Sequence, residues 1–125
     1  MDLIEFVNKR AFPEKVAAVL NTFGFTDPEL EELELEEINS TYYKIGEIEY
    51  IILDDHDIDE IIETIKENFK LCIHEILENE GYESIHDYIN WNDYFVRNPV
   101  DINELIPGLT ELYFNNKWYY YSDLI

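Results

Sequence analysis

Basic residues are scarce in this chain. Its 125 residues include 8 Lys and Arg against 29 Asp and Glu, which gives a formal net charge of -21. Nucleic acid and anionic membrane surfaces are both bound through Lys and Arg. Only Lys9, Arg10 and Lys15 lie near one another in the sequence. The composition therefore excludes nucleic acid as a direct ligand and disfavours a membrane surface.

Cysteine, glycine and long apolar runs are also scarce. Cys72 is the single cysteine and cannot form an internal disulfide, which agrees with a reducing compartment. The start of the chain carries Asp2 and Glu5 and has no apolar run of signal-peptide length, and no later stretch approaches a membrane span. We therefore expect a cytoplasmic protein. The four glycines form no phosphate-binding loop.

Apolar and aromatic residues, by contrast, are plentiful. Hydrophobic residues make up 46% of the chain and aromatic residues 15%, which is enough for a core and argues against disorder. We expect one domain spanning residues 1–125, so the negative charge belongs to a folded body. A net charge of this size destabilises a compact state through self-repulsion. This cost in stability favours a functional explanation of the charge over solubility alone.

The pattern of apolar residues predicts an α+β fold with one long amphipathic helix, further helices and two antiparallel hairpins. The long helix runs from Ile58 to Leu77 with one buried stripe, capped by Asp57 and Glu60 and ended by Gly81. The hairpins are expected over residues 41–53, turning at Gly46, and over residues 112–121, turning at Asn115 and Asn116. Shorter helices are expected to begin at Asp2, Pro13 and Ser84, the last ending at Asn98, while residues 27–37 favour neither helix nor strand.

No motif in the sequence supplies a catalytic apparatus, a metal site or a cofactor site. The alternating acids of Asp55, Asp57 and Asp59 resemble the start of a calcium loop, but Glu60 and Lys66 replace its glycine and last glutamate. Cys72 and His74 point in opposite directions on a helix, so Cys72 is expected in the core. His86 and Asp87 match a fragment of a metal-dependent phosphohydrolase motif, whose further ligands are not identifiable.

The distribution of acids is the remaining lead. They concentrate in Asp27–Glu37, Glu47–Glu67 and Glu75–Asp93, with few cations between them. A domain of this length spans roughly 36 Å, over which duplex DNA carries about 21 charges. The sequence therefore favours a surface that imitates DNA, provided that the acids share one side. The partner-binding residues that we expect are Asp54, Asp55, Asp59, Glu60, Glu63, Glu67, Glu31, Glu34 and Glu36.

Two segments resemble known proteins of mobile elements. The run Glu49-Tyr50-Ile51-Ile52-Leu53-Asp54-Asp55, followed by Asp59-Glu60, resembles the E-Y-L-V-L-T-D segment of small acidic bacteriophage proteins. The run Tyr88-Ile89-Asn90-Trp91-Asn92-Asp93-Tyr94, followed by Arg97, is similar to the Y-I-D-Y-x-x-Y stretch of plasmid and phage antirestriction proteins of the DNA-mimic type. Arg97 lies one residue later than in that pattern and the chain is shorter, so the resemblance does not by itself imply their elongated dimer. The resemblance implies an inhibitor that occupies the DNA site of a host nuclease.

Two hypotheses of binding follow, and one of catalysis. The first is an anti-CRISPR or antirestriction protein that presents carboxylates to the nucleic-acid channel of a basic host nuclease or CRISPR effector. The second is an immunity protein that neutralises a nuclease toxin. A metal-dependent hydrolase built on His86 and Asp87 is the third. We expect a binding protein and not an enzyme, while the target and a homodimer stay open. Tyr88, Trp91 and Tyr94 are expected to pack inside the protein.

Overall fold

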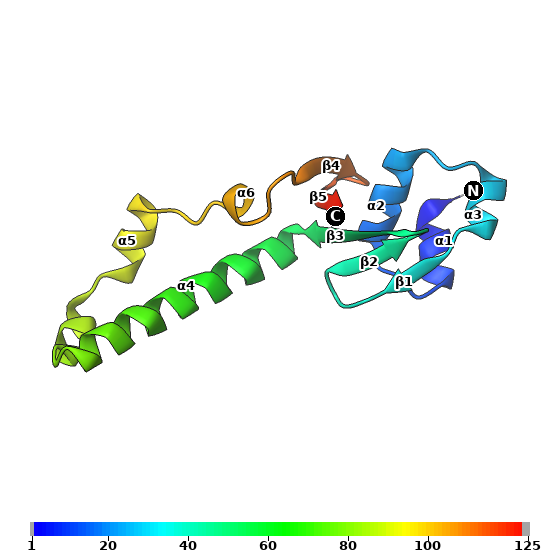
Figure 1. Ribbon diagram of the computed structural model, residues 1–125. Coiled ribbons are helices and arrows are strands. Elements are labelled where there is room, and N and C mark those ends of the chain that lie inside the picture. Colours follow the sequence, from blue (N-terminus) through cyan, green and yellow to red (C-terminus); the bar gives the residue numbers. More distant parts are fainter. Residues whose placement is uncertain (1, 124–125) are drawn as a thin grey trace. The chain divides into compact units, whose positions relative to one another are not determined.

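The computed structural model describes residues 2–123, apart from the side chain of Glu83, and it has the predicted α+β architecture. Within these residues five antiparallel strands form one sheet in the order β1-β2-β3-β5-β4. The strands are β1 (Leu35–Glu37), β2 (Tyr42–Ile45), β3 (Ile48–Asp54), β4 (Thr110–Phe114) and β5 (Lys117–Asp123). The α-helices are α1 (Leu3–Lys9), α2 (Glu14–Phe23), α3 (Asp27–Glu32), α4 (Asp55–Asn79), α5 (Trp91–Arg97) and α6 (Ile102–Leu105), as Figure 1 shows.

The chain divides into two compact units. The first comprises Met1–Asp57 with Ile106–Ile125, and the second comprises Ile58–Leu105. The first unit holds α1, α2, α3 and the whole sheet, and the second holds most of α4 together with α5 and α6. The expectation of one domain for residues 1–125 stays a prediction, and the two units are described in turn.

Both predicted N-terminal helices form, and they begin next to the expected residues Asp2 and Pro13. The Asp2 carboxylate accepts a hydrogen bond from the backbone N–H of Ile4 at 2.9 Å and so caps α1. Pro13 precedes α2, and Gly24 ends it with a φ of 70°, a left-handed conformation that glycine adopts without strain. Residues 27–37, for which the sequence favours neither helix nor strand, contain both, because α3 is followed by the short strand β1.

Both predicted hairpins form and join into a single sheet. β2 and β3 turn at Gly46, and β4 and β5 turn at Asn115 and Asn116, whose φ angles of 51° and 64° suit a tight two-residue turn. The hairpins pair through β3 and β5, with Ile52 opposite Tyr121. The two paired strands are about 70 residues apart in the sequence, so no local sequence pattern predicts that they pair.

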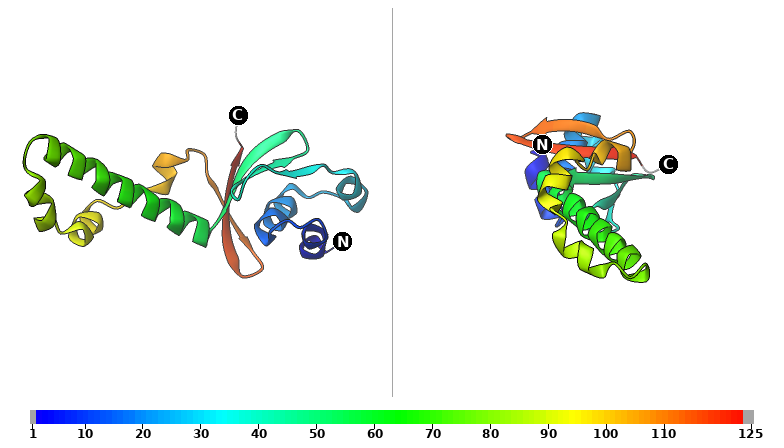
Figure 2. Two further views of the ribbon diagram at one scale, coloured as in Figure 1. Left: turned by 90° about the horizontal axis from the view of Figure 1, so that it is seen from below. Right: turned by 90° about the vertical axis from the view of Figure 1, so that its left-hand side faces the viewer.

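The hydrophobic core lies between the helices and one face of the sheet in the first unit. Helix α2 packs on α1 and against β3, β4 and β5, an arrangement visible in Figure 2. Residues 15–20 of α2 are all buried. The helix is therefore covered around more of its circumference than the single apolar side that its sequence pattern predicted. The fully buried apolar side chains include Val7, Leu20, Leu30 and Ile52.

The long helix forms as predicted and extends three residues further toward the N-terminus. Its first turn is held by Asp54 and Asp57, each of whose carboxylates accepts a hydrogen bond from the other's backbone N–H, at 2.8 and 3.0 Å. The predicted capping pair of Asp57 and Glu60 is therefore wrong, because Asp57 completes its cap with the residue before the helix. Gly81, with a φ of 80°, follows the helix as expected.

The predicted burial of the stripe on α4 is wrong. No residue of α4 is fully buried; Ile65 is half-buried, and Ile76 retains 53% of its exposed surface. Cys72, expected in the core, is exposed. The reason is that the described residues of the second unit contain no second layer comparable to the sheet, so the stripe is covered only in part.

The single helix predicted from Ser84 to Asn98 is also wrong. A 3-10 helix (Glu83–Tyr88) ends at Ile89, whose ψ of 122° is extended, and α5 begins afresh after Asn90. The Asn90 side chain accepts a hydrogen bond from the Asp93 N–H at 3.1 Å, so it acts as a helix cap that divides the segment. Tyr88, expected to pack inside, is 85% exposed.

Candidate functional site

The predicted acids on α4 form one face of that helix. Asp59, Glu60, Glu63 and Glu67 are all exposed and, at about 100° per residue, fall within roughly a third of the helix circumference. Lysines accompany two of them: Lys66 lies 3.6 Å from Glu63 and Lys70 lies 3.1 Å from Glu67. These are exposed i,i+3 pairs of little energetic consequence. The face is therefore acidic with two lysines within it.

The predicted acids of the first unit occupy a different surface, around α3 and β1. Glu31, Glu34 and Glu36 are all exposed. β1 is an edge strand, and charged side chains on an edge strand also discourage pairing with other chains. Next to them, Glu29 closes a capping box with Thr26, whose hydroxyl and backbone hydrogen bonds lower the pKa of the Glu29 carboxyl. Some acids here thus have local structural roles.

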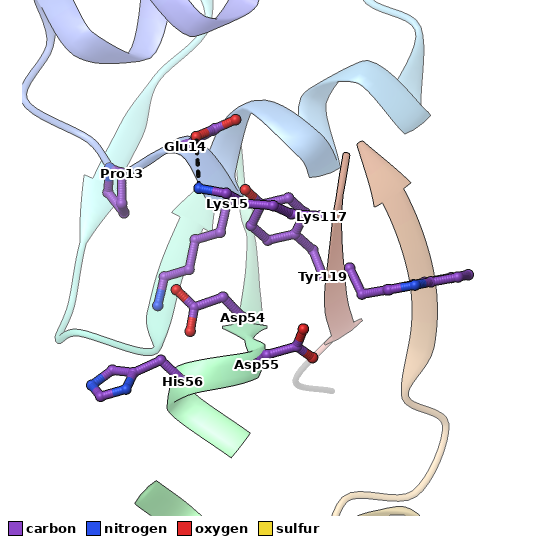
Figure 3. A pocket seen from close by; sticks show the side chains of 9 residues that line it. Pro13, Glu14, Lys15, Asp54, Asp55, His56, Lys117 and Tyr119 are labelled. Atoms are coloured by element: carbon purple, nitrogen blue, oxygen red, sulfur yellow. Dashed lines mark ion pairs between the residues drawn. The ribbon is translucent and has the colours of Figure 1, made fainter. Parts of the chain in front are cut away.

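Asp54 and Asp55 line a pocket in the first unit. The pocket has a volume of about 300 Å³ and is shown in Figure 3. Glu14 and Lys117 lie on one side of it and the two aspartates on the other. Glu14 and Lys117 approach to 3.9 Å, and the hydroxyl of Tyr120 donates to the Asp55 carboxylate at 3.0 Å. The structure therefore places these two predicted residues in a concave site, separate from the α3 and β1 acids.

A buried ion pair beside this pocket was missed by the sequence reasoning. The Lys15 ammonium lies 2.7 Å from the Asp57 carboxylate and donates to the Ser40 carbonyl at 2.5 Å, while Lys15 as a whole is 5% exposed. Burial acts to raise the pKa of Asp57, but hydrogen bonds from Lys15 and the Asp54 backbone, with the charge of Lys15, lower it overall. The available signal was the position of Lys15 in a run whose next five residues are apolar.

Tyrosines around the pocket lie in a negative electrostatic environment. The pKa of Tyr120 is raised to about 12, first by burial, then by its hydrogen bond to Asp55 and the nearby charges of Asp55 and Glu111. The pKa of Tyr119 is raised by burial and by the charges of Glu14 and Asp54. Both phenols are therefore protonated at neutral pH and can serve as hydrogen-bond donors.

The histidines considered for metal chemistry pack against aromatic rings. His74 and His86 lie with ring centroids 4.8 Å apart, and His86 also contacts Trp91 at 5.7 Å. Within residues 2–123, no three His, Cys, Asp or Glu side chains are placed to hold a metal ion together. The same part of the chain has no helix whose length and apolar character would let it span a membrane.

No protein family model, curated protein or solved structure matches the chain. Function is therefore inferred from the residues themselves.

Proposed function

We propose that this protein is an acidic inhibitor that imitates DNA and occupies the nucleic-acid site of a basic host-defence nuclease, either a CRISPR effector or a restriction enzyme. It acts by binding and not by catalysis, in the cytoplasm of a bacterial host. The observation that carries the proposal is that the two units both expose carboxylates while most of their cations are held by other groups of the same chain.

The charge is divided almost evenly between the units. The first unit has seventeen acids and five basic residues, a net charge of -12, and the second has twelve acids and three basic residues, a net charge of -9. Neither unit is a neutral scaffold for the other. A basic partner would therefore be attracted by both, which raises the rate of encounter at low ionic strength.

Several cations contact other groups of the chain, although among the described basic residues only Lys15 is buried. Lys15 is buried against Asp57, and Arg10 donates to the backbone carbonyls of Leu33 and Leu30, at 2.8 and 3.4 Å, near the end of α3. Arg97 lies 3.4 Å from Asp93. The exposed surface is negative because acids outnumber basic residues in both units, which is the pattern expected of a protein that meets Lys and Arg.

The charge of α4 alone is too sparse to imitate a duplex. The helix has eight acids and two lysines, a net charge of -6 over about 37 Å at 1.5 Å per residue. Duplex DNA carries about 22 charges over that length. Mimicry therefore requires the acids of the first unit as well, including those around α3 and β1.

An immunity protein for a nuclease toxin is the second candidate, because the same carboxylates would complement a basic toxin. Immunity proteins need not cover the DNA site, so the two functions differ in whether DNA can bind at the same time. A toxin gene beside this one would favour immunity, whereas neighbouring phage genes would favour the inhibitor.

Charge reversal on each surface tests the proposal. Glu60→Lys with Glu63→Lys changes the α4 face by four charges, and Glu31→Lys with Glu34→Lys changes the first unit by the same amount. Each double variant should weaken binding to a nuclease identified from a panel of CRISPR effectors and restriction enzymes by at least about tenfold, or 1.4 kcal/mol. Affinity is measured by surface plasmon resonance at several salt concentrations.

The two variants are each other's control, because they carry identical net charge. Equal loss would show that both surfaces contribute, as the proposal requires. Full affinity of the α4 variant would restrict the binding surface to the acids around α3 and β1. Full affinity of both variants would contradict a binding site made of these carboxylates.

A further inference from the structure

Strand β4 is an open edge of the sheet in the first unit. It pairs with β5 on one side, and the strand order of the described residues ends with it. Phe114 and Lys117 flank the two-residue turn as a hydrogen-bonded pair. Because hydrogen-bonded and non-hydrogen-bonded pairs alternate along an antiparallel ladder, Glu111 and Tyr113 direct their backbone groups away from β5. Each of these two residues therefore presents an N–H and a C=O to a further strand.

The side chains of the same two residues lie on the exposed face of the sheet. Tyr113 is 61% exposed, and its ring contacts that of Trp118, 47% exposed, with centroids 5.1 Å apart. This contact agrees with a non-hydrogen-bonded pair, in which side chains lie closest. Glu111 lies opposite Tyr120, whose pKa is raised by burial, by Asp55 and by the charge of Glu111. One carboxylate and three aromatic rings thus border the open backbone.

The opposite edge of the sheet is different. On β1, Glu36 lies directly opposite Lys44, so its charge has a cation across the ladder. Within residues 2–123 no basic side chain forms an ion pair with Glu111, whose neighbour across the ladder is a phenol. Edge strands are often protected from pairing by Lys or Pro, and β4 has neither. The charge and the backbone groups of β4 are therefore both open to a partner.

Both features favour an extended ligand that is positively charged. An edge strand binds another strand through its backbone, and alternate side chains of that strand then lie beside the exposed side chains of the edge. A cation beside Glu111 forms an ion pair across the new ladder, and an arginine beside Tyr113 lies against an aromatic ring. A second copy of this chain is disfavoured, because each first unit has a net charge of -12.

We propose that β4 binds an extended segment of the basic partner as an added strand, with Lys or Arg at the alternate positions that face Glu111 and Tyr113. The source of the segment rests on the proposed function, whereas the affinity of the edge for a basic strand does not. The N–H and C=O groups of these two residues hold the segment. Its residue opposite Leu112 lies on the core side of the sheet and is apolar, because Leu112 packs against the core.

The first experiment titrates isotope-labelled protein with a short capped peptide in which arginine and valine alternate. A peptide of the same composition with its arginines consecutive is the control for charge. The alternating peptide should bind at least about fivefold more tightly at equal ionic strength. It should also slow hydrogen exchange of the Glu111 and Tyr113 amides at least about fivefold at saturation. Equal binding of the two peptides, or unchanged exchange of these amides, would overturn the proposal.

Variants of β4 separate the backbone from the side chains. Tyr113→Pro removes an outward N–H, which an edge strand tolerates, whereas Tyr113→Val removes the ring and keeps the N–H. The proline variant should bind the alternating peptide at least about fivefold more weakly than the valine variant. Equal affinities would mean that no strand is added. Glu111→Gln should weaken binding about threefold, a test that does not depend on the proline variant folding. Glu49→Gln, which removes an exposed acid from β3, should leave it unchanged.

The second experiment measures the affinity of Tyr113→Pro and Tyr113→Val for the basic partner. A greater loss with proline supports a strand of the partner as the occupant. Equal affinities overturn that assignment even where the peptide binds, and they leave the proposed function standing. A dimer of this chain that protects the same two amides without peptide would overturn the basic ligand in favour of a second copy. Loss of partner affinity with DNA still bound in the partner's channel would overturn the proposed function alone.

Discussion

The two units of this protein differ in how they are stabilised although both are strongly acidic. Every fully buried side chain among the described residues belongs to the first unit, where α2 packs against the sheet and α1 packs on α2. In the second unit, aromatic contacts such as Phe69 on Trp91 and Tyr94 take the place of a core. The acidic residues therefore lie both on a unit with a packed core and on a unit whose apolar side chains are only partly covered.

This difference shows what an amphipathic pattern does and does not determine. The apolar spacing on α4 correctly predicts a helix, because it follows from local periodicity. Depth of burial depends on which other element covers the stripe, and the sequence of α4 has no information about that. By contrast, residues 15–20 of α2, a shorter helix, are all buried because the sheet lies against it.

The largest expected effect on stability comes from placing a charge in the core of the first unit, and the same change on α4 is the comparison. Ile52→Asp places a carboxylate at a site with 0% exposure and should cost more than about 4 kcal/mol, enough to unfold the first unit. Ile65→Asp, on half-buried surface of α4, should cost about 1 to 2 kcal/mol. Urea unfolding followed by circular dichroism measures both. Complete unfolding by Ile65→Asp would mean that α4 belongs to a common core.

A smaller effect concerns the buried Lys15–Asp57 pair in the first unit. Lys15→Met leaves Asp57 unpaired and should cost roughly 3 to 5 kcal/mol. Adding Asp57→Asn should recover part of that loss, because no buried charge is then left. Thermal unfolding of the two variants at neutral pH measures both values. If the second substitution restored no stability, Asp57 would be stabilised mainly by its hydrogen bonds with the backbone at the start of α4.

The same pair predicts a dependence on pH. The pKa of Asp57 is lowered by folding, so its contribution is complete above the pKa of an unfolded aspartate, about 3.9, and is lost as the pH falls through the lower folded value. Acidification through that range should therefore destabilise the parent protein more than Lys15→Met. Identical acid sensitivity of the two proteins would contradict the assignment of this pair.

The sequence predicted most of the fold and less of the site. Caps such as Asp2 and turns such as Asn115-Asn116 are local, and they form as expected. The pairing of β3 with β5 is not local, and it helps to form the pocket by placing Asp54 opposite Tyr119. The distribution of acids therefore selected Asp55 as a candidate but could not predict that the Tyr120 hydroxyl donates to its carboxylate at 3.0 Å.

Whether this protein and DNA compete for one site is tested most directly by binding both to the same nuclease. The nuclease is loaded with fluorescent duplex DNA, the protein is added at several salt concentrations, and bound DNA and bound protein are detected separately. A protein with Glu31, Glu34, Glu60 and Glu63 changed to Gln is the control for charge. The proposal predicts mutually exclusive binding that weakens as ionic strength rises, less steeply than DNA binding because carboxylates release fewer condensed counterions. A stable ternary complex with DNA still in its channel would contradict mimicry and leave an inhibitor of the immunity type.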